Sequence, residues 1–351
     1  MQPAAEVAVA PPDQRRQVRA IVITVGKWVL IAIAVYYFTR LVRRIDWATV
    51  GHALSLLTAW QVAVLLLVIV ARQVVSAFPL SLFVPGLGLG GALANDLGGT
   101  TVAVVTPPPA DIVVRMAMFR TWGVDVSRGL AGLILNSLFY YVARLAAPVL
   151  GFLLAWVWLG FDPALAWPAL TGGGVALAIA VVLALSMRSS GAAAAAGRLA
   201  GRLLRKVRRS APGPEDLERR FVQFYENVSD RLYKTWPAAS LSLVLLLALE
   251  ASLLVLSLRF VGVPPDLATA VLIASSFLGL YPLTALPFMG LGVLDATVIT
   301  FIAHRSPANA SELVAGLIVW RVCVQLVPMV FGAGALGWWR LRHREVVEPA
   351  S

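Results

Sequence analysis

The sequence predicts an all-α, polytopic integral membrane bundle made of two inverted repeats, each with a broken or re-entrant helical hairpin. The chain has 351 residues, of which 59% are hydrophobic and 13% charged, and its mean hydropathy is +0.82. A soluble domain carries roughly 25% charged residues. Several apolar runs reach about 18 residues, enough to cross the hydrocarbon core of a bilayer. Two further long apolar stretches are interrupted in the middle, and an acid follows each interruption.

The apolar runs divide the chain into two transmembrane halves around a polar loop. We expect a tail at 1–19 and a first half at 20–187, with spans at 20–38, 58–84, 129–159 and 165–187 and a broken hairpin at 91–119. A loop at 188–235 follows. The second half, 236–340, has spans at 236–260 and 311–339 and a broken hairpin at 266–304, and the chain ends in a tail at 341–351. The run at 20–38 lacks a small-residue cleavage site, so we expect a retained helix rather than a removed signal peptide.

The two interruptions have the same design. Pro107, Pro108 and Pro109 precede Asp111, and Gly290 and Gly292 precede Asp295. Proline cannot continue a helical hydrogen-bond ladder, and glycine permits sharp turns. Beyond each acid, at equal distance, the chain reads Ala-Gly-Leu-Ile, at 131–134 and 315–318. Broken membrane helices at corresponding places in two halves indicate a solute or lipid path, although an ordinary kinked span is the alternative.

Each interruption also predicts an anion site. A helix beginning near Asp111 or Asp295 would present unpaired backbone amides and the positive end of its dipole. We expect each acid to cap those amides when no ligand is present.

Basic residues indicate the orientation of the chain. The 188–235 loop contains many more Lys and Arg than Asp and Glu, and Arg340, Arg342 and Arg344 lie near the C-terminus. The positive-inside rule places both regions in the cytoplasm, and counting the spans places the N-terminus there as well. We therefore expect a multi-pass protein of the plasma membrane with both termini in the cytoplasm. Arg40, Arg43 and Arg44, which fall on the outer side, go against this rule. Counting spans from the cytoplasmic N-terminus makes the two broken hairpins enter from opposite faces, as inverted repeats require.

Within the loop, an apolar stripe recurs at helical spacing, which predicts a helix on the cytoplasmic surface; its members are Leu217, Phe221, Phe224, Val228 and Leu232. A polybasic stretch precedes it: Arg198, Arg202, Arg205, Lys206, Arg208 and Arg209. The net charge of +11 therefore indicates anionic lipid headgroups as partners, not nucleic acid. A plain linker between the two halves is the alternative interpretation.

Ionisable side chains at span centres are expensive and need partners or water. They are Arg72, Asp96, Asp111, Arg115, Arg144, Glu250, Asp295 and Arg321. Asp111 and Arg115 are four residues apart and could pair on one helical face. In one interpretation the four arginines face a hydrated groove and bind a phosphate, for which guanidinium geometry is suited. In the other, pairs such as Glu250 with an arginine hold the helices together.

Cysteine and histidine usage narrows the chemistry. Cys323 is the single cysteine, and His52, His304 and His343 are scattered, which excludes a disulfide framework and a conventional zinc cluster. The sequence predicts no cofactor and no catalytic residues, and favours a protein that is not an enzyme.

The residues at the two interruptions resemble a known family. Gly290-Leu291-Gly292-Val293-Leu294-Asp295, and more loosely Pro107 to Asp111 with Arg115, are similar to motifs of the transmembrane region of lysylphosphatidylglycerol synthases, a flippase-like family. Asp295 stands where the family motif has Glu, Phe288-Met289 replace Pro-Gly, and the first motif is altered at Ala110 and Asp111. The resemblance implies lipid translocation, or an auxiliary role to enzymes that act on lipid-linked substrates. Because the aminoacyl-transferase domain of full synthases is absent, lysyl-lipid synthesis is not expected.

Together these features predict a membrane protein that translocates or presents an anionic lipid, either a phospholipid or a polyprenyl-phosphate-linked glycan. The expected binding residues are Arg72, Arg115, Arg144, Arg321, Asp111, Asp295, Gly290 and Gly292, with Glu250 as a candidate for energy coupling. An intramembrane transferase acting on a lipid-linked sugar, and a scaffold for a partner glycosyltransferase or synthase, remain alternatives. The sequence leaves the lipid, the direction of movement and the oligomeric state open.

Overall fold

The computed structural model describes residues 47–106, 109–207, 212–263, 265, 269–306 and 308–343. The expected tail at 1–19, the span at 20–38 and most of the C-terminal tail lie outside these residues, as do Pro107, Pro108, Arg208 and Arg209.

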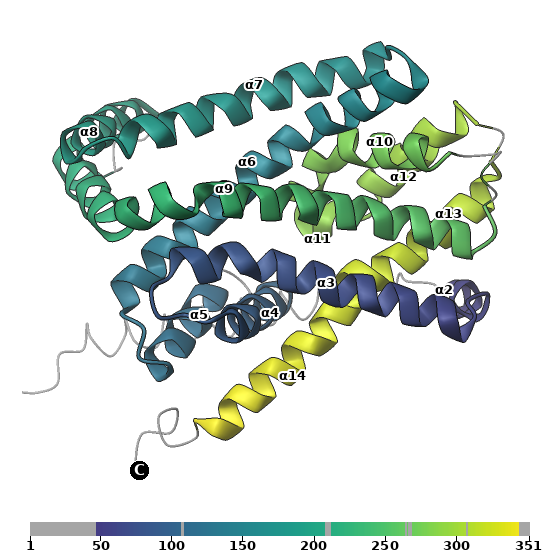
Figure 1. Ribbon diagram of the computed structural model, residues 1–351, viewed down its shortest axis with the longest axis horizontal. Coiled ribbons are helices and arrows are strands. Elements are labelled where there is room, and N and C mark those ends of the chain that lie inside the picture. Colours follow the sequence, from purple (N-terminus) through teal and green to yellow (C-terminus); the bar gives the residue numbers. More distant parts are fainter. Residues whose placement is uncertain are drawn as a thin grey trace, which may run out of the picture.

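Every regular element in the described part of the chain is helical (Figure 1). The elements are α2 (Trp47–Ser55), α3 (Ala59–Phe83), α4 (Leu89–Val105), α5 (Ala110–Thr121), α6 (Val126–Leu159), α7 (Pro163–Ser186), α8 (Ser190–Val207), α9 (Pro214–Phe260), α10 (Ala270–Leu280), η1 (Tyr281–Ala285), α11 (Pro287–Gly290), α12 (Val293–Ala303), α13 (Ala310–Arg321), η2 (Val322–Leu326) and α14 (Val327–Arg342).

Five of these segments are long and apolar enough to cross a membrane: Ala59–Phe83, Val126–Leu159, Pro163–Ser186, Arg231–Phe260 and Ala310–Arg342. They coincide with the five spans that the sequence predicts within the described residues, so the all-α, multi-pass fold class is confirmed. Leucines and valines on their outer faces are exposed, because the solvent for these surfaces is lipid.

The region after the basic loop differs from its prediction. The expected surface helix and the span at 236–260 form one continuous helix, α9, of 47 residues. The apolar stripe also does not lie free on a membrane surface: Val228 and Leu232 are buried with Phe83 and Met187, and Phe224 packs on the same cluster. Helix α8 covers another part of this region, with Gly197 against the backbone of Glu218. The stripe's periodicity is helical as predicted, but protein rather than lipid covers it.

Helices α3 and α9 lie side by side and run in opposite directions (Figure 1). Their contacts fix the antiparallel register, since Arg231 bonds to Leu82, Ser242 to Val75 and Arg72 to Glu250. Each of these helices precedes one of the broken segments. The helices after the broken segments, α6 and α13–α14, also run in opposite senses along the bundle (Figure 1).

Two glycines from the shared Ala-Gly-Leu-Ile string make similar contacts. Gly132 of α6 packs against the C-terminal end of α3, where a Cβ atom would lie 2.5 Å from a Val84 methyl group. Gly316 of α13 packs near the C-terminal end of α9, where a Cβ atom would lie 2.4 Å from a Leu258 methyl group. Small residues allow this close helix approach within membranes. In both halves the helix after the break therefore rests on the helix before it.

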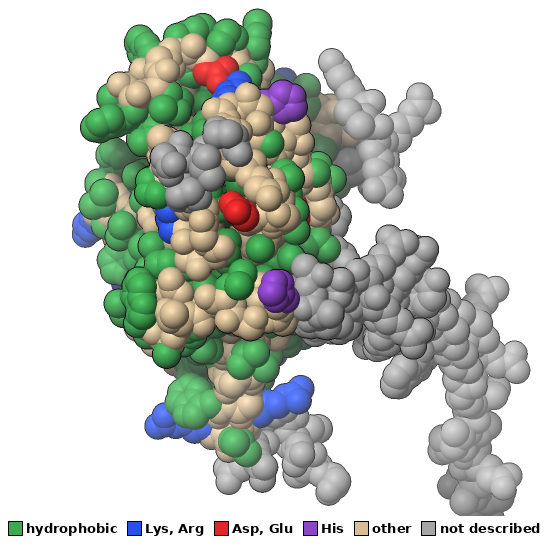
Figure 2. Space-filling model, turned by 90° about the vertical axis from the view of Figure 1, so that its right-hand side faces the viewer, with side chains coloured by type: hydrophobic (Ala, Val, Ile, Leu, Met, Phe, Trp, Pro, Cys, Tyr) green, Lys and Arg blue, Asp and Glu red, His purple; other side chains and the backbone are tan. Residues whose placement is uncertain are grey.

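The two ends of the bundle differ in charge. One end contains the α6–α7 corner, the C-terminal end of α9 and the start of α3, where Trp60 and Phe260 meet edge to face with ring centroids 5.3 Å apart. Figure 2 shows that hydrophobic and uncharged polar groups cover most of this end and that charged side chains there are few. Arg305 lies here, bonded to Asp162, the N-cap residue of α7, just after the C-terminal end of α6. Arg120 precedes the other end of the same 34-residue helix, on the side of α8 and its arginines.

Candidate functional site

The second interruption is a chain of short helices that changes direction inside the bundle. Helix α10 gives way to a 3-10 segment, η1, then to the single turn α11, and α12 begins after Gly292. Gly290 and Gly292 have φ angles of +67° and +82°, which favour glycine, and Met289 adopts a left-handed φ of +55°. A non-glycine residue in this region is strained, and such strain concentrates at functional sites.

Asp295 caps the start of α12, as the sequence predicts. One carboxylate oxygen, Oδ2, accepts a hydrogen bond from the backbone N–H of Gly292 at 2.7 Å. The carboxylate therefore lies against the positive end of the helix dipole, in the place where a bound anion is stabilised.

Arg321, from the end of α13, holds the other side of this carboxylate. Its Nε and Nη2 atoms donate to the two oxygens of Asp295 at 2.9 Å each, and Nη1 donates to the carbonyl of Met289 at 3.2 Å. Arg321 is 9% exposed. A π-helical segment, η2, follows directly, and such segments are frequent at functional sites. Residues from the break and from the following span thus form one fork-like site.

The first interruption is organised differently from its prediction. Arg115 does not pair with Asp111 among the described residues. Its guanidinium lies 3.7 Å from the Asp96 carboxylate of α4, and it donates to Asn95, the Asp96 carbonyl and Thr100 at 3.3–3.4 Å. The close packing of α4 against α5 offers Arg115 several acceptors, whereas Asp111 lies in the first turn of α5.

The expected capping role of Asp111 is also wrong. The N-cap of α5 is Pro109, and it has no side-chain cap hydrogen bond. Asp111 is the second residue of α5, and the proline before the helix has no backbone N–H. The bond that Asp295 accepts as the third residue of α12 therefore has no counterpart here.

Glycine makes room for the buried Arg115 side chain. Gly99 of α4 faces the guanidinium so closely that a Cβ atom there would lie 2.1 Å from Nε of Arg115. Arg115 is 8% exposed. The cation is therefore held in a slot formed by backbone and small polar groups.

Arg72 and Glu250 form the central pair between the two halves. Nη2 of Arg72 lies 2.5 Å from Oε1 of Glu250, Nε lies 3.1 Å from the same oxygen, and Gln73 accepts a further bond. Glu250 is 1% exposed, and its other oxygen, Oε2, has no hydrogen-bond partner among the described residues. The buried hydroxyl of Tyr281 in η1 interacts with Glu250 as well. This pair is the arrangement that the structural interpretation of the sequence predicts.

Arg144 is the exception among the four membrane arginines. It pairs with no carboxylate within the described ranges, and its guanidinium lies 5.7 Å from the centre of the Tyr141 ring.

Sequence reasoning missed the residues that connect these charges. Ser76 of α3 donates to Asp96 at 3.1 Å, and the hydroxyl of Tyr140 in α6 lies 2.5 Å from that of Ser76. The Tyr140 hydroxyl also donates to the backbone carbonyl of Ser76 at 2.9 Å. A buried polar series therefore extends from α5 through α4, α3 and α6 toward α9 and η1. Isolated Ser and Tyr residues within apolar spans are too common to reveal such a series.

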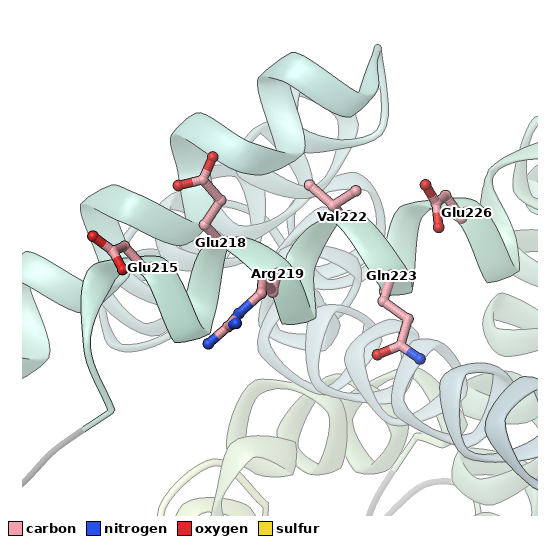
Figure 3. A pocket seen from close by; sticks show the side chains of 6 residues that line it. All are labelled: Glu215, Glu218, Arg219, Val222, Gln223 and Glu226. Atoms are coloured by element: carbon pink, nitrogen blue, oxygen red, sulfur yellow. The ribbon is translucent and has the colours of Figure 1, made fainter.

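The described cavities lie away from these charges. One, of about 390 Å³, is a surface hollow whose six lining residues all come from α9 (Figure 3). Its neighbour Asp216 accepts a hydrogen bond from Arg219, which lowers the pKa of that carboxyl. A second, of about 580 Å³, is an apolar groove between α6, α7, α10 and η1. A third, of about 530 Å³, lies at the α6–α7 corner. None of the three is lined by Arg72, Arg115, Arg144 or Arg321.

Possible metal ligands are dispersed in the described residues. No group of three or more His, Cys, Asp and Glu side chains there could hold a metal ion. Asp96, Asp295 and Glu250 instead each face an arginine.

The helices, the breaks and their paired charges define a multi-pass membrane protein with interrupted helices in each half. The chain matches the family described as the lysylphosphatidylglycerol synthase TM region over residues 23–332. It therefore belongs to that family, and the resemblance drawn from the two motifs is confirmed. No curated protein matches the chain.

Proposed function

We propose that this protein binds the headgroup of an anionic lipid at the second interruption and moves or presents that lipid across the bilayer. The observation that carries the proposal is the Asp295–Arg321 fork at the start of α12. A carboxylate there receives two guanidinium hydrogen bonds and one backbone N–H. A phosphate offers the same acceptor geometry with more oxygens and more charge.

In this proposal Asp295 occupies the anion position when no lipid is bound. An incoming phosphate takes over the N–H of Gly292 and the guanidinium of Arg321, and the flexible turn at Gly290 and Gly292 lets the α12 end adjust. The lipid tails remain in the hydrocarbon, since the outer faces of the spans are apolar.

The remaining buried charges have supporting roles in the proposal. Arg115 and Arg144 provide further positive charge along the path, with Arg72 at its centre. Asp111 lies at the first break, where the structure gives it no capping bond among the described residues. Glu250 is the coupling candidate, because protonation of its carboxyl would release Arg72 from the central pair.

Two broken segments in oppositely directed halves fit an inverted repeat, with both termini in the cytoplasm and the basic α8 end facing anionic lipids of the plasma membrane. Single-cysteine labelling tests this, because Cys323 is the only cysteine. In a Cys323→Ser background, Ser127→Cys should react with an impermeant reagent from the cytoplasmic side and Ala303→Cys from the opposite side. Reaction of both from one side would contradict the inverted arrangement.

Reconstitution tests the function directly. Purified protein in liposomes should accelerate the exchange of fluorescent anionic phospholipids between leaflets, measured by chemical quenching of the outer leaflet. Arg321→Gln should reduce the rate about tenfold or more, the equivalent of losing a charged hydrogen bond worth about 1.5–3 kcal/mol. The control is Arg219→Gln, which removes a surface ion pair. Exchange no faster than in empty vesicles, for anionic phospholipids and lipid-linked glycans alike, would reject the proposal.

A scaffold for a partner synthase or glycosyltransferase is the second candidate, because Arg72, Arg115 and Arg321 are already paired with carboxylates inside the chain. Internal pairs of this kind can serve packing alone. Exchange no faster than in empty vesicles, from a protein that remains folded, would favour this candidate.

A further inference from the structure

The cavity at the α6–α7 corner combines an apolar wall with a polar one. It measures about 530 Å³ and lies between that corner and the outer end of the second broken segment. Ala155, Leu159, Leu165 and Leu272 contribute the apolar wall, and the polar residues include Thr269, Ser306 and the pair Asp162–Arg305. A cavity of mixed character at the end of a bundle suits the polar part of an amphiphile.

The two charges of this cavity already satisfy each other. Arg305 donates from Nε and Nη2 to Oδ2 of Asp162 at 3.0 and 2.7 Å, and from Nη1 to the carbonyl of Phe301 at 3.4 Å. The guanidinium also stacks 3.7 Å from the centre of the Phe301 ring. Oδ1 of Asp162 accepts the N–H of Ala164. Asp295 follows the flexible turn at Gly290 and Gly292, whereas Asp162 caps α7 directly before Pro163, whose φ is fixed. We therefore expect the Asp162 carboxylate to stay beside Arg305, so that the cavity does not favour a phosphate.

The Asp162–Arg305 pair is better suited to bind hydroxyl groups. Carboxylate oxygens retain lone pairs for O–H donors, and the Arg305, Thr269 and Ser306 side chains can complete a network around several hydroxyls. Phe161, which lines the cavity, is 65% exposed and presents an apolar ring to any ligand there. Hydroxyls in a ring beside an apolar face are the chemistry of a sugar.

The position of the cavity links it to the fork at Asp295 and Arg321. Helix α12 begins at that fork and ends at Ala303, two residues before Arg305. At about 1.5 Å per residue, the two places are separated by roughly 15 Å. A ligand that reached both would need an extended polar part beyond its phosphate.

From the neutral pair, the exposed ring and this spacing, we propose that the α6–α7 corner cavity binds a sugar ring, and thus that the lipid substrate carries a glycan beyond its phosphate. This inference rests on the proposed function, and it selects the glycan-bearing lipid over the simple phospholipid.

Short alkyl probes test the cavity in protein embedded in nanodiscs of zwitterionic phospholipid. Saturation-transfer NMR should show transfer to the ring protons of hexyl β-glucoside, with weaker binding of hexyl phosphate. Phe161→Ala should weaken the glucoside signal at least fivefold, and because this side chain is mostly exposed the fold should remain intact. Asp162→Asn, which keeps an oxygen for the α7 cap, should weaken it as well. The control is Asp216→Asn on the α9 surface.

Preferential binding of hexyl phosphate, equal binding of hexanol and the glucoside, or a glucoside signal that neither variant changes would overturn the inference. The exchange assay on the same protein separates the two proposals. Arg321-dependent exchange of anionic phospholipid without glucoside binding rejects the sugar cavity alone. Glucoside binding in a protein that exchanges no lipid rejects the proposed function.

Discussion

The two interruptions share a sequence design but hold their arginines in different ways. At the second, Arg321 comes from the following long segment and meets Asp295 through two bonds of 2.9 Å. At the first, Arg115 belongs to the short helix after the break and makes only contacts of 3.3–3.7 Å. The second is therefore a closely paired arginine–carboxylate fork, which we propose as the anion site, and the first is a buried cation surrounded mainly by neutral acceptors.

The difference follows from one residue type at the break. Asp295 lies three positions after Gly292 and accepts its N–H, whereas Asp111 lies two positions after Pro109, which has no N–H to donate. Asp111 consequently accepts no capping hydrogen bond from the residue before α5, and the Arg115 guanidinium contacts groups of α4. Similar motifs in two halves of a chain can thus produce sites of unequal strength.

The largest expected effect separates the two arginines in lipid exchange. We expect Arg321→Gln to lower the exchange rate about tenfold or more, the equivalent of a charged hydrogen bond worth about 1.5–3 kcal/mol. Arg115→Gln should lower it only about threefold, since the contacts of Arg115 are longer, at 3.3–3.7 Å, and the proposal places no phosphate on them. Rates in liposomes with equal protein content measure this. A greater loss in Arg115→Gln would reverse the ranking of the two sites.

A second prediction concerns the Arg72–Glu250 pair, which joins the helices that precede the two breaks. Replacing either residue by Leu leaves a buried charge alone and should lower the free energy of unfolding by about 3–5 kcal/mol. The double variant Arg72→Leu/Glu250→Leu should recover most of that loss, as followed by thermal unfolding in detergent. If Glu250 couples lipid movement, the recovered double variant remains inactive.

Full exchange activity in the stable double variant would instead assign this pair to packing. Failure of the double variant to recover stability would show that the two side chains make their main contacts with other groups.

A smaller effect compares glycines at the two interruptions. Gly290→Ala should cost about 1–2 kcal/mol, because its φ is +67° and the new Cβ would lie 2.5 Å from the Leu283 carbonyl. Gly99→Ala meets only the movable Arg115 side chain, so it should change stability little but displace that guanidinium. Gly90→Ala, with nothing within 4 Å, is the control in the same helix. Equal unfolding temperatures for Gly290→Ala and Gly90→Ala would contradict this account of the second break.

Much of the fold could be predicted from the sequence because hydrocarbon imposes simple rules. Span length and apolarity located the five described membrane segments, and prolines and glycines located both interruptions. Periodicity alone could not say whether Val228 and Leu232 face lipid or protein, since both surroundings favour the same residues. The length of the apolar run also could not show that the span at 236–260 continues into the preceding polar segment as one helix, α9.

The candidate site was predictable in its residue types but only partly in its pairing. Asp295 at a helix start follows from local chain geometry, because a cap forms within a few residues. The partners Asp96 for Arg115 and Glu250 for Arg72 come from other helices and depend on packing that one sequence does not specify. The prediction of an Asp111–Arg115 pair was wrong for this reason, because Arg115 contacts Asp96 of the neighbouring helix α4 and not the acid on its own helix.

Photo-crosslinking at matched positions tests the central claim most directly. Leu291 at the second break and Ile112 at the first are 39% and 40% exposed, so a photoreactive amino acid at either meets lipid to a similar extent. In mixed liposomes, position 291 should capture labelled anionic lipid in preference to zwitterionic lipid, and Arg321→Gln should abolish that preference, while position 112 should show little selectivity. An unselective capture at 291, or a selectivity that survives Arg321→Gln, would contradict the account.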